Sequence, residues 1–156
     1  MTDHAPFSEP DLSGAAAIAR GVARYYWQAG WSCLREVSLP NGRRADLVAL
    51  SRRGEIAIVE VKSGLADFQS DAKWGDYLEF CDVFDFAVDA AFPLGRLPQD
   101  VGVLIADAYG AARHLTGPRV ALSPARRKAM VQRLARTAAD RLMVLADPDF
   151  VPEHGL

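Results

Sequence analysis

The sequence is poor in cysteine and histidine, which limits the metal and redox chemistry it can support. Its 156 residues include two cysteines and three histidines. Cys33 and Cys81 have no cysteine or histidine neighbour at a zinc-site spacing, which excludes that class of site. We interpret both as small buried residues of a reducing compartment. His4, His114 and His154 are scattered, and we assign none of them to a site.

Long apolar runs are also absent. No uninterrupted apolar stretch approaches the length of a membrane span. The opening stretch MTDHAPFSEP carries acid and proline instead of the basic and apolar regions of a signal peptide. We therefore expect a cytoplasmic protein with no membrane partner. Residues 1–11 are expected to be a flexible lead-in, and residues 12–156 a single domain.

The chain has little net charge, but its charges are unevenly distributed. The formal total is −2, which does not predict nucleic-acid binding. Residues 67–89 hold seven acidic residues and one lysine, whereas residues 113–141 hold eight basic residues and one acidic residue. Such asymmetry can create a local basic face on a nearly neutral protein.

Hydrophobic periodicity predicts an α/β fold in which helices flank a mixed sheet. We expect helices from Ser13 to a capping Gly30, over 67–80, and over about 124–146. The predicted strands are SCLREVSL, RRADLVAL, EIAIVEVK, VFDFAV, VGVLIAD and AARHL. Hairpins plus one crossover would join them. The last helix is expected to pack through Val131, Leu134, Ala135, Ala138, Leu142 and Leu145, with Arg126, Arg133, Arg136 and Asp140 opposite.

The second and third strands are predicted to form a hairpin that brings two acids together. The stretch SRRGE between them suits a three-residue loop with Gly54 in the left-handed conformation. This loop pairs Val48 with Ile58 and sets Asp46 opposite Glu60, with β-carbons about 5 Å apart. Two carboxylates so close repel each other. One could be protonated, both could face solvent, or a cation could lie between them.

The third strand, EIAIVEVK, is apolar except near its end. Side chains alternate along a strand, so Glu60 and Lys62 share a face about 7 Å apart. Their apolar neighbours predict a largely buried face, where uncompensated charge is costly. A divalent ion such as Mg²⁺ would neutralise the acids, since it prefers one or two carboxylates and several waters. A surface Glu–Lys pair at the end of the sheet is the alternative.

These residues resemble the D…(D/E)xK signature of the PD-(D/E)XK nuclease superfamily, with its restriction-endonuclease-like αβββαβ core. The stretches GRRADLVAL, VEVKSGLADFQSDAKWGDYLEFCD and FAV resemble more closely the MmcB family of predicted bacterial DNA-repair endonucleases. The resemblance implies that Asp46, Glu60 and the carbonyl of Val61 ligate Mg²⁺ or Mn²⁺. Lys62 would then orient the attacking water or stabilise the phosphorane. Ala45 stands in place of the superfamily's proline.

One further carboxylate and several polar residues are candidates around this site. Many relatives use a glutamate of the first helix as an additional ligand, which this helix lacks, and Glu36 is either its substitute or a surface residue. Gln69 and Lys73, four residues apart, either contact phosphate or are ordinary solvated residues. Asp67 is available as an N-terminal helix cap. We expect Trp74 and Tyr77 to pack in the core, in preference to stacking on a base. Five arginines lie at the strand ends around the expected site: Arg35, Arg43, Arg44, Arg52 and Arg53. Arg43 and Arg44 have the best claim to contact phosphates.

The sequence therefore predicts a Mg²⁺-dependent phosphodiesterase that acts on DNA, in DNA repair. Its expected partners are DNA, bound through the phosphate backbone, and repair proteins, with a homodimer as an option. An alternative keeps the fold without the chemistry, as a DNA-binding or protein-interaction module. A third possibility is an RNA-processing nuclease or a small-molecule enzyme, because nothing in the residues excludes RNA.

Overall fold

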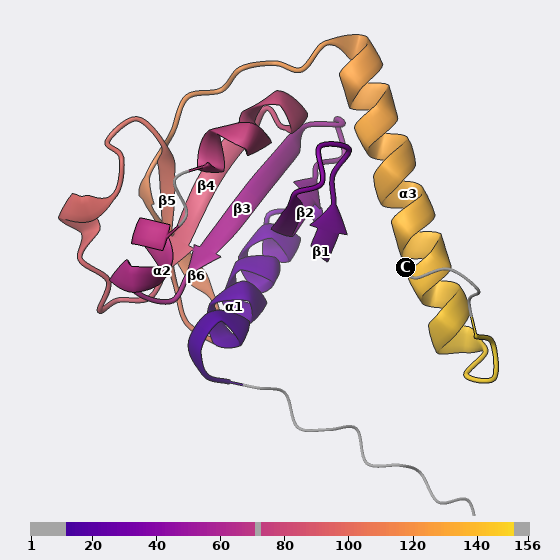
Figure 1. Ribbon diagram of the computed structural model, residues 1–156, viewed down its shortest axis with the longest axis horizontal. Coiled ribbons are helices and arrows are strands. Elements are labelled where there is room, and N and C mark those ends of the chain that lie inside the picture. Colours follow the sequence, from indigo (N-terminus) through magenta and orange to yellow (C-terminus); the bar gives the residue numbers. More distant parts are fainter. Residues whose placement is uncertain (1–11, 71–72, 152–156) are drawn as a thin grey trace, which may run out of the picture.

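A six-stranded mixed sheet forms the centre of the molecule (Figure 1). The computed structural model describes residues 12–70 and 73–151, so the predicted lead-in over 1–11 lies outside the described residues. The strands lie in chain order, and they are β1 (Ser32–Ser38), β2 (Arg44–Leu50), β3 (Ile56–Lys62), β4 (Val83–Val88), β5 (Gly102–Ala106) and β6 (Ala111–Leu115). All six strands and the mixed sheet predicted from the sequence are confirmed.

The strand directions differ from the prediction at one point. The β1–β2, β2–β3 and β5–β6 pairs are antiparallel, whereas β3–β4 and β4–β5 are parallel. Because a parallel pair needs a crossover connection, the sheet contains two crossovers and the expected single crossover is wrong. The second connection, residues 89–101, carries only the short 3-10 helix η2 (Leu94–Arg96), so it has no helical periodicity to reveal it.

Helices cover both faces of the sheet. Helix α1 (Gly14–Gln28) packs Ile18 and Val22 onto one face, where they meet Leu47, Val59 and Leu104. The other face is covered by α2 (Leu65–Ser70) and the 3-10 helix η1 (Trp74–Phe80), and α3 (Pro124–Ala146) adds Met130 and Leu134 to this core. Strand β3 therefore lies between two apolar cores, and all seven of its residues are buried.

Local sequence signals explain the ends of these elements. Helix α1 ends at Gln28, and Gly30, two residues later, has a φ of +82° and donates its N–H to the carbonyl of Trp27. The hairpin between β2 and β3 turns at Gly54, with a φ of +86°. There the N–H of Ser51 donates to the carbonyl of Glu55 at 2.9 Å, so both the predicted cap and the predicted loop are confirmed.

The helix predicted over 67–80 is instead interrupted. Helix α2 ends at Ser70, and η1 begins at Trp74. Gln69 and Lys73 therefore do not share a helix face as the sequence suggested. Trp74 and Tyr77 stack on Phe84, with ring centroids 5.6 and 5.9 Å away, which confirms that they belong to the core.

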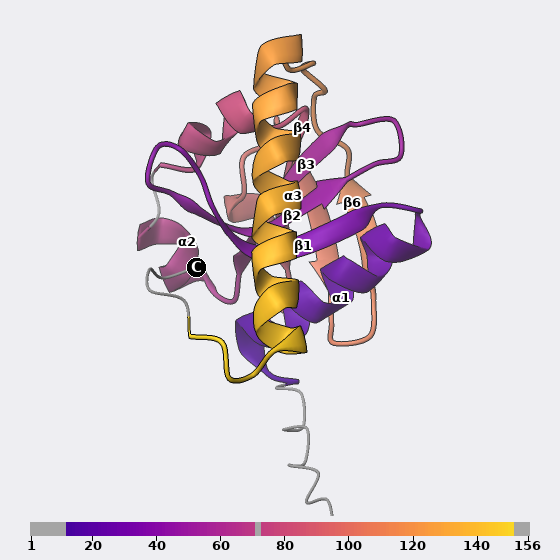
Figure 2. The ribbon, with the colours of Figure 1, turned by 90° about the vertical axis from the view of Figure 1, so that its right-hand side faces the viewer.

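The bounds predicted for the last helix are confirmed, but most of its predicted apolar face is wrong. Leu134 is buried, whereas Leu142 and Leu145 are 66% and 78% exposed, and Ala135 and Ala138 are exposed as well. Figure 2 shows α3 running past β1 at the edge of the sheet. Only a narrow part of its surface can meet the domain there.

Arginines make much of the contact between α3 and the domain. Arg133 donates to the carbonyl of Ser38 at 3.0 Å, and Arg141 donates to the carbonyls of Arg35 and Glu36. These long side chains reach backbone acceptors at the edge of the sheet that an apolar face could not satisfy. The polar face that was expected to point to solvent therefore partly faces the protein.

The acidic and basic stretches of the sequence pair with each other inside the fold. Salt bridges join Glu79 to Arg126, Asp82 to Arg127 and Asp85 to Arg113, at 2.8, 2.6 and 2.7 Å. Asp85 is fully buried. The uneven charge distribution is thus in part a set of long-range structural contacts and not a free basic face.

The two cysteines behave as the sequence indicates. Cys81 is buried and Cys33 is half-buried, and neither forms a disulfide. Burial raises the pKa of the Cys33 thiol to about 11 and that of Cys81 to about 12. Both thiols are therefore protonated and poorly nucleophilic near neutral pH. No helix within residues 12–70 and 73–151 is long and apolar enough to cross a membrane.

Candidate functional site

A polar cavity lies where the ends of β2 and β3 meet α1. Its volume is about 410 Å³. Its walls include the small residues Ala15, Ala16 and Ala19 of α1. The charged residues and the strand residue that complete the lining are Arg35, Glu36, Asp46, Glu60, Val61, Lys62 and Asp67. The cavity therefore contains all three residues of the predicted catalytic signature.

Asp46 and Glu60 come from neighbouring strands and are held together through the backbone. The register pairs Leu47 with Val59, and its continuation by one residue sets Asp46 opposite Glu60. The N–H of Asp46 donates to Oε1 of Glu60 at 3.1 Å, and the N–H of Val61 donates to Oδ2 of Asp46 at 2.7 Å. The two carboxylates thus converge as the hairpin predicted, while their chemical roles remain predictions.

The surroundings of Asp46 disfavour its negative charge. Burial raises the pKa of this carboxyl above its usual value, and the hydrogen bond from the Val61 N–H opposes that rise. The charges of Glu36 and Asp67 also raise the pKa, whereas that of Lys62 lowers it. Added positive charge in the cavity would therefore stabilise the ionised form of Asp46.

Lys62 is an unusual lysine because it is almost completely buried. Glu60 and Lys62 are each only 4% exposed. The Lys62 Nζ lies 4.0 Å from Oδ1 of Asp67, whose Oδ2 accepts the N–H of Ser63 at 3.3 Å. A charged lysine is rarely buried unless acidic groups surround it. The cavity thus holds an ammonium group beside two strand carboxylates.

Arg35 and Asp67 line the cavity, although neither was predicted as a leading site residue. The connection from Lys62 to α2 is only two residues long, which returns the chain at Asp67 to the end of β3. Arg35 pairs with Leu47, the neighbour of Asp46, across the β1–β2 ladder. Asp67 was recognisable in principle from the short connection, whereas the register sets Arg35 opposite Leu47 and would not by itself have placed it beside Asp46.

Glu36 lies in the cavity lining but is engaged elsewhere. Its backbone has a φ of +53°, a conformation that is rare for a residue with a side chain. Its Oε2 accepts from Nε of Arg44 at 2.7 Å, and both side chains are substantially exposed. Glu36 is therefore placed near Asp46 with its carboxylate held by an arginine.

The other predicted phosphate-binding residues do not line this cavity. Arg43 binds Oδ2 of Asp76 through Nε and Nη2, at 3.1 and 3.0 Å, which ties the β1–β2 loop to η1. Gln69 and Lys73 are both exposed and lie outside the lining. Their proposed contacts with phosphate remain predictions that the structure does not test.

The donor set of the cavity fits a hard divalent cation. Asp46, Glu60 and the carbonyl of Val61 would supply oxygen ligands, which suit Mg²⁺ together with waters. Within residues 12–70 and 73–151, no three His, Cys, Asp or Glu side chains are grouped so that they could hold one ion. The fit therefore rests on two carboxylates and leaves the other coordination positions to backbone and water.

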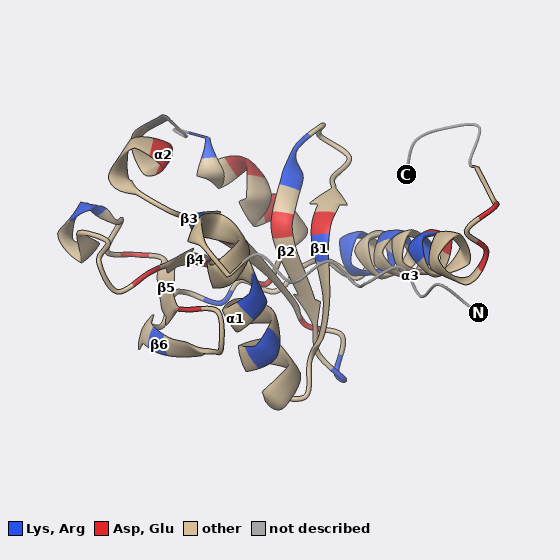
Figure 3. Cartoon of the chain, turned by 90° about the horizontal axis from the view of Figure 1, so that it is seen from below, with Lys and Arg blue, Asp and Glu red and all other residues tan. Residues whose placement is uncertain are grey.

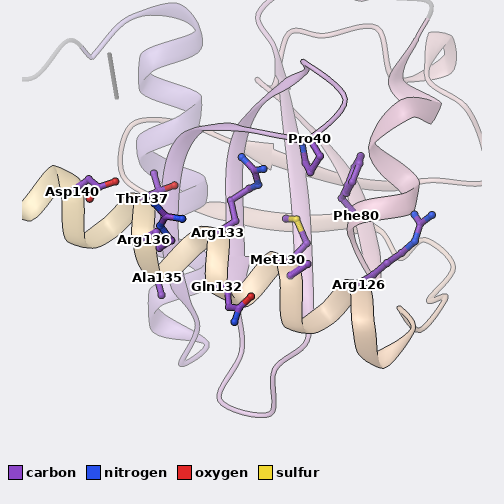
Figure 4. Close-up of a pocket in the computed structure, with 11 residues that line it drawn as sticks. Pro40, Phe80, Arg126, Met130, Gln132, Arg133, Ala135, Arg136, Thr137 and Asp140 are labelled. Carbon is purple, nitrogen blue, oxygen red and sulfur yellow. The ribbon is translucent and has the colours of Figure 1, made fainter. Parts of the chain in front are cut away.

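A second groove lies along α3, away from these residues. It has a volume of about 840 Å³. Figure 4 shows Arg126, Met130 and Arg133 directed from the helix toward Pro40 and Phe80. Arg126 and Arg133 already bind Glu79 and the carbonyl of Ser38. None of the predicted site residues lines this groove.

Comparison with known proteins gives two matches. A family model described as "DNA repair protein MmcB-like" matches residues 4–149. A solved structure described as "SPO1766 protein of unknown function from Silicibacter pomeroyi" has a TM-score of 0.86 and 45% sequence identity. That match covers 94% of this chain and 98% of the other. A search of curated proteins finds no match.

Proposed function

Because the chain belongs to the MmcB-like family of DNA repair proteins, we propose that it hydrolyses phosphodiester bonds of DNA with the help of Mg²⁺ or Mn²⁺. The family description supports the DNA-repair role and contact with DNA. The observation that carries the chemistry is the convergence of Asp46 and Glu60 beside the buried Lys62 in one cavity. This arrangement agrees with the catalytic signature of the PD-(D/E)XK nucleases that the sequence resembles.

In this proposal each residue has a defined task. The carboxylates of Asp46 and Glu60 and the carbonyl of Val61 would hold the metal, which would supply a lowered water pKa and positive charge for the phosphoryl oxygens when bound. The Lys62 ammonium orients the attacking water or stabilises negative charge that develops on the phosphoryl group.

The reaction itself is a balanced hydrolysis. The oxygen of water forms a bond to phosphorus, and the bond from phosphorus to the leaving oxygen of the next nucleotide breaks. One proton of the water ends on that leaving oxygen. The products are one end with a hydroxyl group and one end with a phosphate monoester.

Cleavage assays with single-site variants test the proposal. We expect wild-type protein to cleave labelled DNA in Mg²⁺ or Mn²⁺ and to lose activity when the ion is chelated. Lys62→Ala should lower the rate by roughly 100-fold or more, which is the effect of removing one preorganised charge. Single-stranded, duplex, flap and junction DNA and one RNA strand should be compared. Equal residual activity in the wild type and Lys62→Ala would point to a contaminating nuclease and contradict the proposal.

The main alternative is a module that binds DNA or protein without hydrolysis. Two observations favour it: Glu36 is paired with Arg44, and the described residues contain no group of three metal-ligating side chains. The alternative predicts binding that is indifferent to Asp46→Ala and Glu60→Ala. DNA binding that needs neither residue, together with absent cleavage of every substrate, would support it.

A further inference from the structure

An exposed tryptophan lies on the helix that forms one wall of the candidate site. Trp27 is in the last turn of α1 and is 75% exposed. One exposed aromatic side chain is common on protein surfaces and has no meaning by itself. The residues around Trp27 make it a candidate for ligand binding.

Three arginines surround Trp27. Arg20, Arg24 and Arg35 line the same surface depression as the indole, and its volume is about 580 Å³. Its lining includes no acidic residue within the described part of the chain. We call Arg20, Arg24, Trp27 and Arg35 the Trp27 surface. It combines concentrated positive charge with an accessible aromatic ring.

The Trp27 surface leads directly into the candidate site. Arg35 lines both the surface and the site cavity. On α1, residues 16, 20, 23 and 27 recur at a spacing of three to four, so they share one face of the helix. Ala16, at one end of this face, lines the cavity that contains Asp46. The face is about 16 Å long, from 11 residues at about 1.5 Å each.

The arginines differ in how firmly they are already engaged. Arg20 is half-buried and lies over the ring of Tyr109, with its guanidinium carbon 5.9 Å from the ring centroid. Arg24 and Arg35 are exposed. Figure 3 shows the basic positions along α1 and the acidic positions on β1 and β2 within the same region of the molecule. Arg24 and Arg35 are therefore placed to meet an anionic ligand on its way to the carboxylates.

We propose that the Trp27 surface binds an unpaired segment of DNA and directs it into the candidate site. One base stacks on Trp27, while Arg24 and Arg35 pair with the phosphates on either side. Positive charge along a backbone and an aromatic ring for bases are the two elements of single-strand binding. In intact duplex every base is already stacked between its neighbours, so the ring has no base to receive. This inference rests on DNA being the substrate of the proposed function and narrows it to DNA with a single-stranded segment.

Fluorescence titration without divalent ions tests this proposal independently of catalysis. The probe is a single-stranded oligothymidylate of roughly 12 nucleotides, within the size range of single-strand sites. We expect binding to quench tryptophan emission and to be tighter than binding of a blunt duplex. Trp27→Ala should weaken affinity, measured by anisotropy of the labelled oligonucleotide, by roughly 5- to 100-fold. Trp27→Phe should keep most of the affinity, since its ring can still stack.

Charge variants test the phosphate contacts. Arg24→Ala and Arg35→Ala should each weaken binding and should each make the slope of log affinity against log salt shallower by about 0.7. Two control residues do not line the depression: Phe150→Ala removes an exposed aromatic ring, and Lys128→Ala removes an exposed charge. Both controls should bind like the wild type.

The results separate this proposal from the proposed function. Wild-type affinity in Trp27→Ala, equal affinity for duplex and single strand, or equal losses in the two control variants would overturn the Trp27 surface, even if the protein cleaves DNA. Conversely, Trp27-dependent binding without any cleavage in Mg²⁺ or Mn²⁺ would support the surface and contradict the nuclease activity.

Discussion

The backbone N–H of Asp46 donates a hydrogen bond to the side chain of Glu60 on the neighbouring strand, at 3.1 Å. This contact fixes the two acids of the candidate site against each other. It exists because the hairpin at Gly54 sets the register of β2 and β3. A shift by one residue would turn one acid to the other face of the sheet and dismantle the site.

Replacing Asp46 by asparagine is expected to stabilise the protein in the absence of metal. The folded-state pKa of Asp46 is raised, so the folded protein binds this proton more tightly than the unfolded chain does. Stability is therefore present below the unfolded pKa and is lost as pH rises from there through the raised folded pKa, and the deficit persists at every pH above the folded pKa. Asparagine removes the charge and can still accept the N–H of Val61.

Urea denaturation at pH 7 in a chelator measures this effect. Asp46→Asn should raise the free energy of unfolding by about 0.5–2 kcal/mol, the usual range for a stabilising change. Asp140→Asn, at an exposed position of α3, is the control and should change it little. A destabilised Asp46→Asn would mean that the carboxylate is satisfied in the folded state without a cation.

Asp82 should make the stability of the fold depend on pH in the acidic range. It accepts the N–H groups of Ile56 and Leu122, each at 2.8 Å, and two bonds from Arg127 at 2.7 and 2.6 Å. Burial works to raise the pKa of Asp82, but these bonds outweigh it and lower the pKa to about 2. The carboxylate therefore contributes roughly 2 kcal/mol above about pH 5, and this contribution is lost as pH falls toward 2.

Denaturation curves between pH 7 and pH 2 check this contribution. Asp82→Asn should cost about 3 kcal/mol at neutral pH, because it leaves Arg127 without its charged partner. The variant should also lose less stability than the wild type on acidification. Glu79→Gln breaks the more exposed pair with Arg126 and should have a small effect. Parallel pH profiles for the wild type and Asp82→Asn would contradict this account of Asp82.

The buried carboxylate of Asp85 leaves no room for a side chain at position 102, which is a glycine. The carboxylate of Asp85 is held by Arg113 at 2.7 and 2.9 Å and by the hydroxyl of Tyr26 at 2.8 Å. A β-carbon at position 102 would lie 1.8 Å from Oδ1 of Asp85. Gly102→Ala should therefore lower the free energy of unfolding by about 2–4 kcal/mol, measured by chemical denaturation.

Gly95→Ala is the matched control for Gly102→Ala. A β-carbon at position 95 would meet no atom within 4 Å, so its effect should stay within about 0.5 kcal/mol. Equal stability of the two variants would show that the Asp85 cluster can move aside and is not a rigid element of the fold.

Elements set by local chemistry were predictable from the sequence. Gly54 specified the hairpin loop, the loop specified the register, and the register brought Asp46 to Glu60. Gly30 likewise marked the end of α1. In each case a residue with a strong conformational preference acts on its immediate neighbours, so no knowledge of distant contacts is needed.

Elements set by distant contacts were not predictable. The packing face of α3 follows from Arg127, Arg133 and Arg141, whose partners lie about 45 to 106 residues earlier in the chain. Hydrophobic periodicity predicts which apolar residues pack. It cannot identify an arginine that packs by reaching a buried carboxylate or a carbonyl at the sheet edge. The Trp27 surface was missed for the same reason, since α1 and β1 meet only in the fold.

Titration calorimetry with Mn²⁺ and with Mg²⁺ tests most directly whether Asp46 and Glu60 form a metal site. We expect the wild type to bind the ion, Asp46→Asn and Glu60→Gln to lose binding, and the control Asp140→Asn to retain it. Saturating metal should also raise the melting temperature of the wild type but not of the two site variants, because only the folded site binds the ion. Binding heats that are the same in the wild type, Asp46→Asn and Glu60→Gln would contradict the metal site and, with it, the proposed hydrolytic function.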